Sequence, residues 1–284
     1  MYVVTGATGQ LGQLVIEALL EKVPASEIIA AVRNVEKAAP LADKGVQVRF
    51  ADYTNPQSLV SAFEGASKVL LISSSEVGQR FEQHKAVIDA AKHVGVELLA
   101  YTSLLNANES PLALAQEHKQ TEAYIAQTDI PAALLRNGWY SENYLVGIGA
   151  SLEHGVMLGC AGDGKISSAP RADYAQAAAE VLTQSNQAGK VYELAGDESF
   201  TLEQFAQYLA DLSGQPVAYN NLPESEYAAV LEKVGIPAGF AAILADSETG
   251  ASKGGLFDDS KTLSQLIGRP TVTIEASLKD ALAK

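Results

Sequence analysis

Three glycines near the start of the chain have the spacing of a dinucleotide-binding turn. A short β-branched run, Tyr2 to Thr5, is followed by Gly-Ala-Thr-Gly-Gln-Leu-Gly over residues 6–12, and apolar residues then recur at helical spacing through Leu19. In such a turn the first glycine permits a sharp change of direction. The second lets the backbone approach a pyrophosphate, and the third lets the helix lie close to the sheet. Because amides at a helix start favour anions, the pattern predicts a pyrophosphate site here.

Arg33 stands where the nature of the cofactor is usually decided. It follows the predicted strand Ile28–Val32, about 20 residues after the glycines, where an NADH site places Asp or Glu on the ribose. A guanidinium instead suits a phosphate group bidentately. The position therefore favours NADPH over NADH, although a solvated arginine after a strand is the simpler alternative.

Two later strand ends carry small hydroxylated or aromatic residues. Ser73, Ser74 and Ser75 follow a predicted strand and suit the nicotinamide ribose, or else form a plain serine-rich turn. A second strand end delivers polar and aromatic residues that suit a nicotinamide and an aromatic substrate. These residues are Asn137, Gly138, Trp139, Tyr140, Ser141 and Glu142. The alternative for Trp139 and Tyr140 is a place in the core between two domains.

The elements that must position these residues alternate along the first half of the chain. Apolar runs with little alternation indicate strands that are covered on both faces. They are Tyr2–Thr5, Ile28–Val32, Val46–Phe50, Val69–Ile72, Leu98–Thr102, Ala132–Leu135 and, later, Val191–Leu194. Helical patterns separate them, near Leu11–Leu19, Val35–Lys44, Pro56–Phe63, Gly78–His93 and Leu114–Gln127. Repeated strand–helix units predict an α/β fold, a Rossmann-like doubly wound parallel sheet, with ligands at the carboxyl ends of the strands.

The second half predicts a smaller, discontinuous carboxyl-terminal lobe. We expect a nucleotide-binding domain over 1–136 with a later return near 155–200, and a substrate-covering lobe over 137–284. Helical patterns recur at Ala172–Leu182, Leu202–Leu212 and Glu224–Val234. Arg171 directly precedes the first of them and is a candidate further cation for the ligand cleft. The glycine- and serine-rich stretch 250–255 is expected to be a connecting loop or a mobile lid.

Composition narrows the classes of function. The net charge of −14 disfavours binding to nucleic acid or to an anionic membrane. Cys160 is the single cysteine, so an internal disulfide is impossible and a reducing compartment, the cytoplasm, is expected. No apolar run approaches the length of a membrane span, and the fold is expected to begin at residue 2 without a signal peptide. The sequence is compatible with a homo-oligomer and does not determine the oligomeric state.

Longer motifs give the chain a family resemblance. The turn at residues 6–12, Val-Arg-Asn at 32–34 and Leu-Leu-Arg-Asn-Gly-Trp-Tyr-Ser-Glu-Asn-Tyr at 134–144 together resemble the NmrA-like branch of the atypical short-chain dehydrogenase/reductases. The likeness extends to residues 72–80 and 251–260 and so runs nearly end to end. It implies reduction of a small-molecule quinone by NADPH. It also implies a cofactor surface made of Gly6, Ala7, Thr8, Gly9, Gln10 and Leu11 at the pyrophosphate, Arg33 at the 2′-phosphate, and Ser73–Ser75, Asn137–Glu142 and Arg171 around the rest.

One departure from typical short-chain dehydrogenases concerns the proton. Those enzymes use a Tyr with a Lys four residues later, whereas the comparable helix here reads Leu-Ala-Gln-Glu-His-Lys over residues 114–119. Alcohol dehydrogenation and sugar-nucleotide epimerisation are therefore disfavoured. Quinone reduction tolerates the loss, because its product is a stabilised phenolate that solvent can protonate. His118 is a candidate proton donor, or else half of a surface pair with Glu122.

Two classes of function remain. The leading interpretation is an enzyme that passes hydride from NADPH to a quinone, with no motif for a metal or a flavin. The rival is a dinucleotide-binding redox sensor without turnover, which the missing Tyr–Lys pair suits equally well. The match of the 139–140 and 251–260 segments favours the enzyme.

Overall fold

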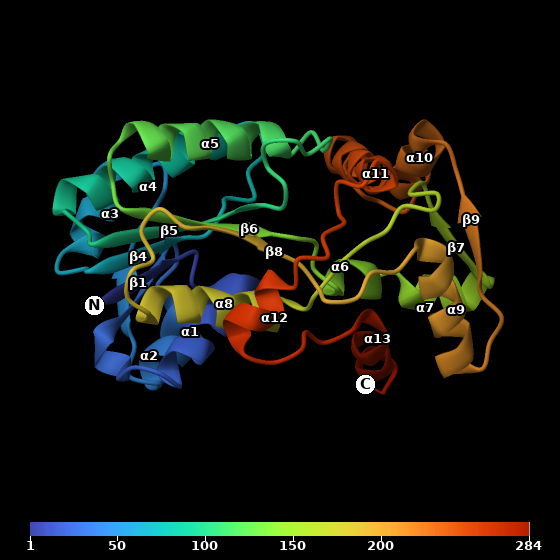
Figure 1. Cartoon of the computed structure of the whole chain (residues 1–284), viewed down its shortest axis with the longest axis horizontal. Coiled ribbons are helices and arrows are strands. Elements are labelled where there is room, and N and C mark those ends of the chain that lie inside the picture. The colour runs from blue at the N-terminus through green and yellow to red at the C-terminus, as the bar shows by residue number, and fades with distance from the viewer. Residues whose placement is uncertain (284) are drawn as a thin grey trace. The chain divides into compact units, whose positions relative to one another are not determined.

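The computed structural model describes residues 1–283, and they form two compact units (Figure 1). Unit 1 comprises residues 1–104, 117–137 and 171–192, and unit 2 comprises residues 105–116, 138–170 and those from 193 onward. The return of the chain to unit 1 is therefore shorter than the expected 155–200. The segment 105–116, which was expected in the nucleotide-binding domain, belongs to unit 2.

A seven-stranded sheet organises unit 1, in the order β3-β2-β1-β4-β5-β6-β8. The strands are β1 (Tyr2–Thr5), β2 (Ile28–Val32), β3 (Gln47–Phe50), β4 (Lys68–Leu71), β5 (Leu98–Leu104), β6 (Ala132–Asn137) and β8 (Val191–Leu194). The pairings from β3 through β6 are all parallel. The order reverses between β1 and β4, where Val4 pairs with Leu70, so the carboxyl ends of these two strands flank the expected ligand crevice. The predicted Rossmann-like α/β fold is confirmed.

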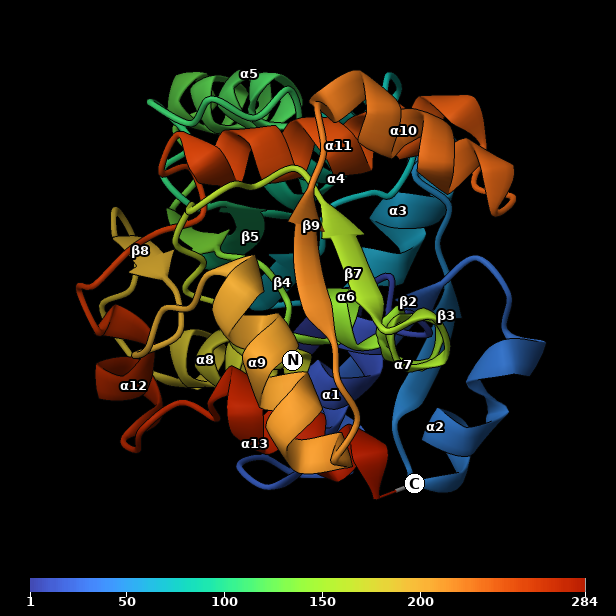
Figure 2. The ribbon, with the colours of Figure 1, turned by 90° about the vertical axis from the view of Figure 1, so that its right-hand side faces the viewer.

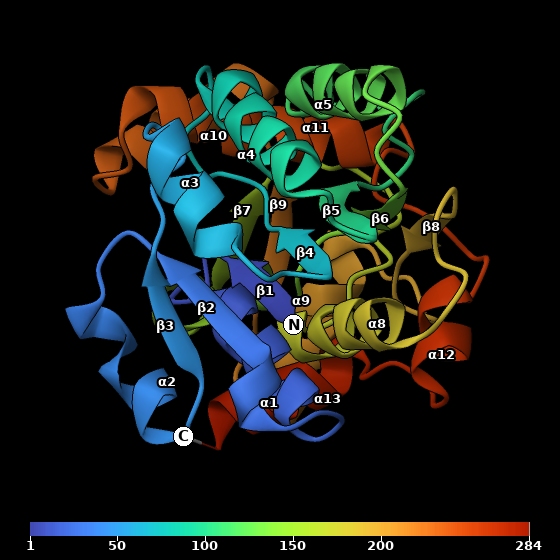
Figure 3. The same cartoon turned by 90° about the vertical axis from the view of Figure 1, so that its left-hand side faces the viewer.

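Helices cover both faces of the sheet, with α3, α4 and α5 on one face and α1 and α8 on the other (Figures 1 and 3). The helical segments are α1 (Gln10–Leu20), η1 (Ala25–Glu27), η2 (Glu36–Ala38), α2 (Ala39–Asp43), α3 (Pro56–Phe63), α4 (Arg80–Val94), α5 (Ala115–Gln127) and α8 (Arg171–Thr183). Local signals fix several ends. Asn55 caps α3 by accepting a hydrogen bond from the amide of Ser58 at 3.2 Å, and Gly95 ends α4 in the left-handed region at φ 72°.

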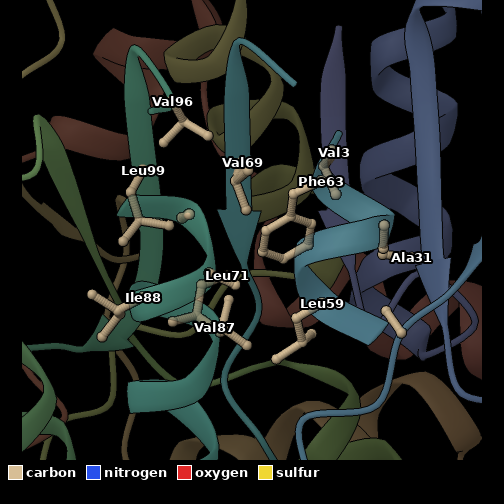
Figure 4. Close-up of a cluster of buried hydrophobic side chains, with 14 of the residues drawn as sticks. Val3, Ala31, Leu59, Phe63, Val69, Leu71, Val87, Ile88, Val96 and Leu99 are labelled. Carbon is tan, nitrogen blue, oxygen red and sulfur yellow. The ribbon is translucent and has the colours of Figure 1, made fainter. Parts of the chain in front are cut away.

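The apolar core lies between the sheet and the helices α3 and α4 (Figure 4). Val3, Val69 and Leu99 project from three neighbouring strands, and Phe63 and Ile88 project from the two helices, all fully buried. Every residue of β2 is buried as well. This explains why the strands read as continuous apolar runs rather than as alternating ones.

Unit 2 contains a two-stranded parallel sheet of β7 (Val156–Gly159) and β9 (Ala218–Asn221), with helices around it (Figure 2). The helices are α6 (Glu142–Leu145), α7 (Ile148–His154), α9 (Leu202–Ser213), α10 (Glu224–Lys233), α11 (Ala238–Ser252), α12 (Thr262–Ile267) and α13 (Ile274–Leu282). A complete capping box of Thr201 and Gln204 starts α9.

The stretch 250–255 differs from the connecting loop or mobile lid that the sequence predicts. Residues 250–252 are the last turn of α11 and not part of a loop or lid. Gly250 and Gly255 are held close to Leu112, because a Cβ on either one would lie 2.6 Å from its Cδ1. The glycines at these positions therefore serve close packing within unit 2.

Candidate functional site

The glycine turn has the geometry that its spacing predicts. Gly6 has φ 59°, in the left-handed region that favours glycine, and the amide of Gly9 donates to its carbonyl at 2.9 Å. A Cβ on Gly12 would overlap the carbonyl oxygen of Gly6 and lie 2.7 Å from Cα of Ala7. Gly12 thus lets α1 start directly against the turn, while Gly9 and Gln10 stay exposed. The helix begins at Gln10 with no side-chain cap, so its first amides are available to an anion.

Arg33 follows β2 and contacts Glu76, a residue from the segment between β4 and α4. Its Nη1 lies 2.9 Å from Glu76 Oε1, and the two side chains are 65% and 40% exposed. The second carboxylate near the guanidinium is Asp52, whose pKa is lowered by hydrogen bonds from Thr54 and, to a smaller extent, by Arg33. The predicted 2′-phosphate site therefore contains one cation and two acidic groups.

The serine segment after β4 is held by buried partners. The amide of Ser73 donates to Thr102 Oγ1, and the amide of Ser74 donates to Nε2 of His84, each at 2.9 Å. Nε of Arg80 donates to the carbonyl oxygen of Ser74 at 2.7 Å. Because His84, Arg80 and Thr102 are all buried, they hold the segment in one conformation at the carboxyl end of β4.

Tyr53 and Thr5 link the strand ends next to the glycine turn. The Tyr53 hydroxyl lies 2.5 Å from Thr5 Oγ1 and 2.9 Å from the carbonyl oxygen of Ile72. Thr5 Oγ1 also accepts from the amide of Ile72 at 3.0 Å. Burial raises the pKa of Tyr53 above its usual value, so this hydroxyl stays protonated. Tyr53, which follows β3, therefore links the ends of β1 and β4.

His118 lies inside the unit. It is 6% exposed, and its Nδ1 lies 2.7 Å from the hydroxyl of the fully buried Tyr101. Burial, aided by the charge of Arg80, lowers the pKa of His118 to about 3, so the imidazole is neutral near pH 7. The alternative of a surface pair with Glu122 is wrong. Glu122 is also buried, and its carboxylate binds Arg136 and not His118.

Asn137, at the end of β6, has a buried side-chain oxygen that lacks a hydrogen-bond donor among the described residues. Its side chain is 5% exposed, and the unpartnered atom is Oδ1. A buried amide oxygen without a donor costs free energy. A ligand that brings a donor to it would remove that cost, as expected for a binding residue.

Asn137 is the last residue of its segment in unit 1, and residues 138–142 belong to unit 2. The amide of Gly138 donates to the carbonyl of Leu194 at 2.7 Å, and the amide of Ser141 donates to the carbonyl of Ala169 at 3.0 Å. Ser141 is fully buried, while Trp139, Tyr140 and Glu142 are half-buried. Arg171 is half-buried at the first position of α8 and belongs to unit 1.

Cys160 lacks the features of a nucleophile. Its side chain is buried, and its Sγ donates to the carbonyl of Ala245 at 3.3 Å. Burial and the nearby Glu248 raise the pKa of the thiol to about 12, so the thiolate is not populated near neutral pH. Over residues 1–283 there is no group of three or more His, Cys, Asp or Glu residues able to hold a metal ion, and no helix long and apolar enough to cross a membrane.

Comparison with known proteins places this geometry in a family. The model of the NmrA-like family matches residues 2–282. This chain is a member of the NmrA-like family. Quinone oxidoreductase 2 of Escherichia coli (strain K12) is 60% identical to it over 278 residues, which cover 98% of this chain and 97% of that protein.

Two solved structures resemble this NmrA-like chain over nearly its whole length. A crystal structure of the NADPH-dependent quinone oxidoreductase from Escherichia coli complexed with NADPH has a TM-score of 0.98 at 59% identity, covering 99% of this chain and all of that one. The triphenylmethane reductase of Citrobacter sp. complexed with NADP(H) has a TM-score of 0.95 at 42% identity, covering 99% of this chain and all of that one.

Three residues that contact the candidate site residues were not identified from the sequence. Glu76, Gln83 and His84 reach the serine segment and Arg33 from α4 and the segment before it. Their types gave no signal, because a buried histidine or glutamine on a helix reads as part of the core. Only the place of the preceding strand end at the sheet's reversal point could have drawn attention to them.

Proposed function

We propose that this chain is an NADPH-dependent quinone oxidoreductase that transfers hydride from NADPH to a quinone. The observation that carries the proposal is the 60% identity to quinone oxidoreductase 2, which extends over 98% of the chain. The missing Tyr–Lys pair agrees with it, since a quinone yields a product that needs no dedicated alcohol-type proton relay.

The residues present fit NADPH. The exposed turn of Gly6, Gly9 and Gln10 at the start of α1 offers backbone amides to a pyrophosphate, and the tight fit at Gly12 keeps that turn close to the helix. The unpartnered Oδ1 of Asn137 fits a ligand that donates a hydrogen bond. In our assignment Gly6–Leu11 hold the pyrophosphate and Arg33 holds the 2′-phosphate. Ser73–Ser75, Asn137–Glu142 and Arg171 surround the remainder.

When bound, the cofactor supplies the hydride and the chain supplies position. The buried contacts of His84, Arg80 and Thr102 fix the serine segment before any ligand arrives. His118 is neutral, and its Nδ1 is hydrogen-bonded to the hydroxyl of Tyr101. Its catalytic assignment stays a prediction, and protonation of the product by solvent requires no residue at all.

Oxidation of NADPH, followed at its absorbance band, tests the proposal. Purified protein is mixed with NADPH with and without a simple benzoquinone. We expect oxidation that depends on both protein and quinone. Tight binding of NADPH without quinone-dependent oxidation would instead establish the redox sensor. We further infer a cytoplasmic location from the lone buried thiol, which fits a reducing compartment.

A further inference from the structure

Arg33 meets an acidic partner of its own chain where the phosphate of NADPH is expected. Its Nη1 donates to Oε1 of Glu76 at 2.9 Å. Both side chains reach solvent, so the pair itself adds little to the stability of the fold. Its position at the proposed 2′-phosphate site suggests an effect on binding instead.

Glu76 is anchored from behind. Its Oε2 accepts from Nε2 of Gln83 at 2.7 Å, and its backbone amide donates to Oγ of Ser74 at 3.1 Å. Gln83 is 5% exposed and also contacts Ser74 through its Oε1. Ser74 is in turn fixed by His84 and Arg80. The carboxylate therefore has a defined place, and a ligand phosphate at Arg33 must share the guanidinium with it.

The charges make this sharing unfavourable for a phosphate. Glu76 and Asp52 both act on Arg33, so the cluster of these three side chains carries a net charge of −1 when all are ionised. A phosphate monoester brings about −1.5 to −2 further charges at neutral pH. A ribose hydroxyl, by contrast, is neutral and donates to a carboxylate, as in sites that accept NADH.

We propose that Glu76 is a specificity-determining residue, which weakens the binding of NADPH by holding Arg33 and repelling the 2′-phosphate, and so lowers the selectivity of the chain for NADPH over NADH. The inference rests on the proposed placement of the 2′-phosphate at Arg33. The two side chains have opposite effects on the binding of a 2′-phosphate. Arg33 donates to a phosphate, and Glu76 opposes the phosphate but not a neutral ribose hydroxyl.

Calorimetric titration of NADPH and NADH into the wild type, Glu76→Gln and Arg33→Ala tests this. Glu76→Gln keeps an oxygen for Gln83 and removes the charge. We expect NADPH to bind it about three- to tenfold more tightly, since exposed charge contacts have effects of this order. The affinity for NADH should change by less than about twofold, and the gain for NADPH should shrink as salt screens the site.

Glu97→Gln is the matched control. Glu97 is exposed and directly precedes β5, so it lies at the amino ends of the parallel strands, whereas Arg33 lies at their carboxyl ends. The same loss of charge there should leave both affinities unchanged. Melting temperatures of all variants verify that each is folded. If Glu76→Gln binds NADPH no more tightly than Glu97→Gln does, while Arg33→Ala loses NADPH selectively, the inference about Glu76 is wrong. Equal weakening of both nucleotides by Arg33→Ala would refute the 2′-phosphate assignment and the inference with it.

Discussion

For some residues of unit 1 the sequence suggests a role, but it does not indicate which residues they contact. Arg33 is a candidate for the 2′-phosphate because an acid is missing at a known position after a strand. Its partner Glu76 could not be predicted, because the ion pair joins residues 43 positions apart. The same holds for Glu122, which the sequence pairs with His118 one helical turn away. In the structure it accepts from Arg136 Nε at 3.0 Å and Nη2 at 2.6 Å. The spacing of residues along one helix does not reveal a contact between that helix and a strand.

The pair of Glu122 and Arg136 yields a prediction about stability. Both residues are less than 10% exposed, and Ser103 Oγ also donates to Glu122 at 2.5 Å. Glu122→Ala removes the carboxylate from a buried guanidinium, so we expect the free energy of unfolding to fall by about 3–5 kcal/mol. Urea denaturation measures the loss. As the control, Glu82→Ala, on the exposed face of α4, should cost less than about 0.5 kcal/mol. A loss below about 1 kcal/mol for Glu122→Ala would contradict the importance of the pair.

Elements in unit 1 could be predicted from the sequence because each carries its own pattern. Strands buried on both faces are apolar throughout, and their ends moved by only one or two residues from the expected bounds. In unit 2 the strands β7 and β9 were missed. β9 (Ala218–Asn221) is largely exposed and reads Ala-Tyr-Asn-Asn, so neither its composition nor its alternation indicates a strand. Its pairing with β7, about 60 residues earlier, is what makes it one.

The junction of β1 and α1 gives a prediction at this scale. Gly12→Ala would place a Cβ against the Gly6 carbonyl and 2.7 Å from Cα of Ala7, both of them backbone atoms that cannot move aside cheaply. We expect α1 to shift from the turn, with a loss of about 1–3 kcal/mol in stability and a weakening of NADPH binding by tenfold or more. Calorimetry and thermal denaturation give the two values. Gly149→Ala is the matched control, because a Cβ there meets nothing within 4 Å. Equal behaviour of the two variants would show that the turn tolerates a side chain.

At the scale of the whole molecule, the chain crosses between its two units several times. The sequence predicted a discontinuous second lobe, but segment 105–116 was not foreseen in it. That segment is fixed to unit 2 by contacts with distant residues. The amide of Asn106 donates to Glu193, and the amide of Ala113 donates to Asp246, both at 2.8 Å. Such contacts follow from the folded path of the chain and have no signature in the segment itself.

The dependence of the molecule's stability on pH should be influenced by Glu248 in α11. Its Oε2 accepts from the amide of Cys160 at 2.5 Å, but burial prevails and raises the pKa of the carboxyl from 4.5 to about 7. The folded chain thus holds this proton more tightly than the unfolded chain does. Its contribution to stability is complete below about pH 4.5 and is lost as the pH rises through about 7.

Glu248→Gln should therefore gain stability relative to the wild type as the pH rises from 5 to 8, by about 2–3 kcal/mol. The amide mimics the protonated acid, which is the form that the buried site favours. Urea denaturation at both pH values measures the difference. Glu232→Gln, an exposed change of the same kind in α10, should follow the wild type at both. If the two variants shift alike between pH 5 and 8, Glu248 does not hold its proton in the folded state, and the pH dependence must come from other groups.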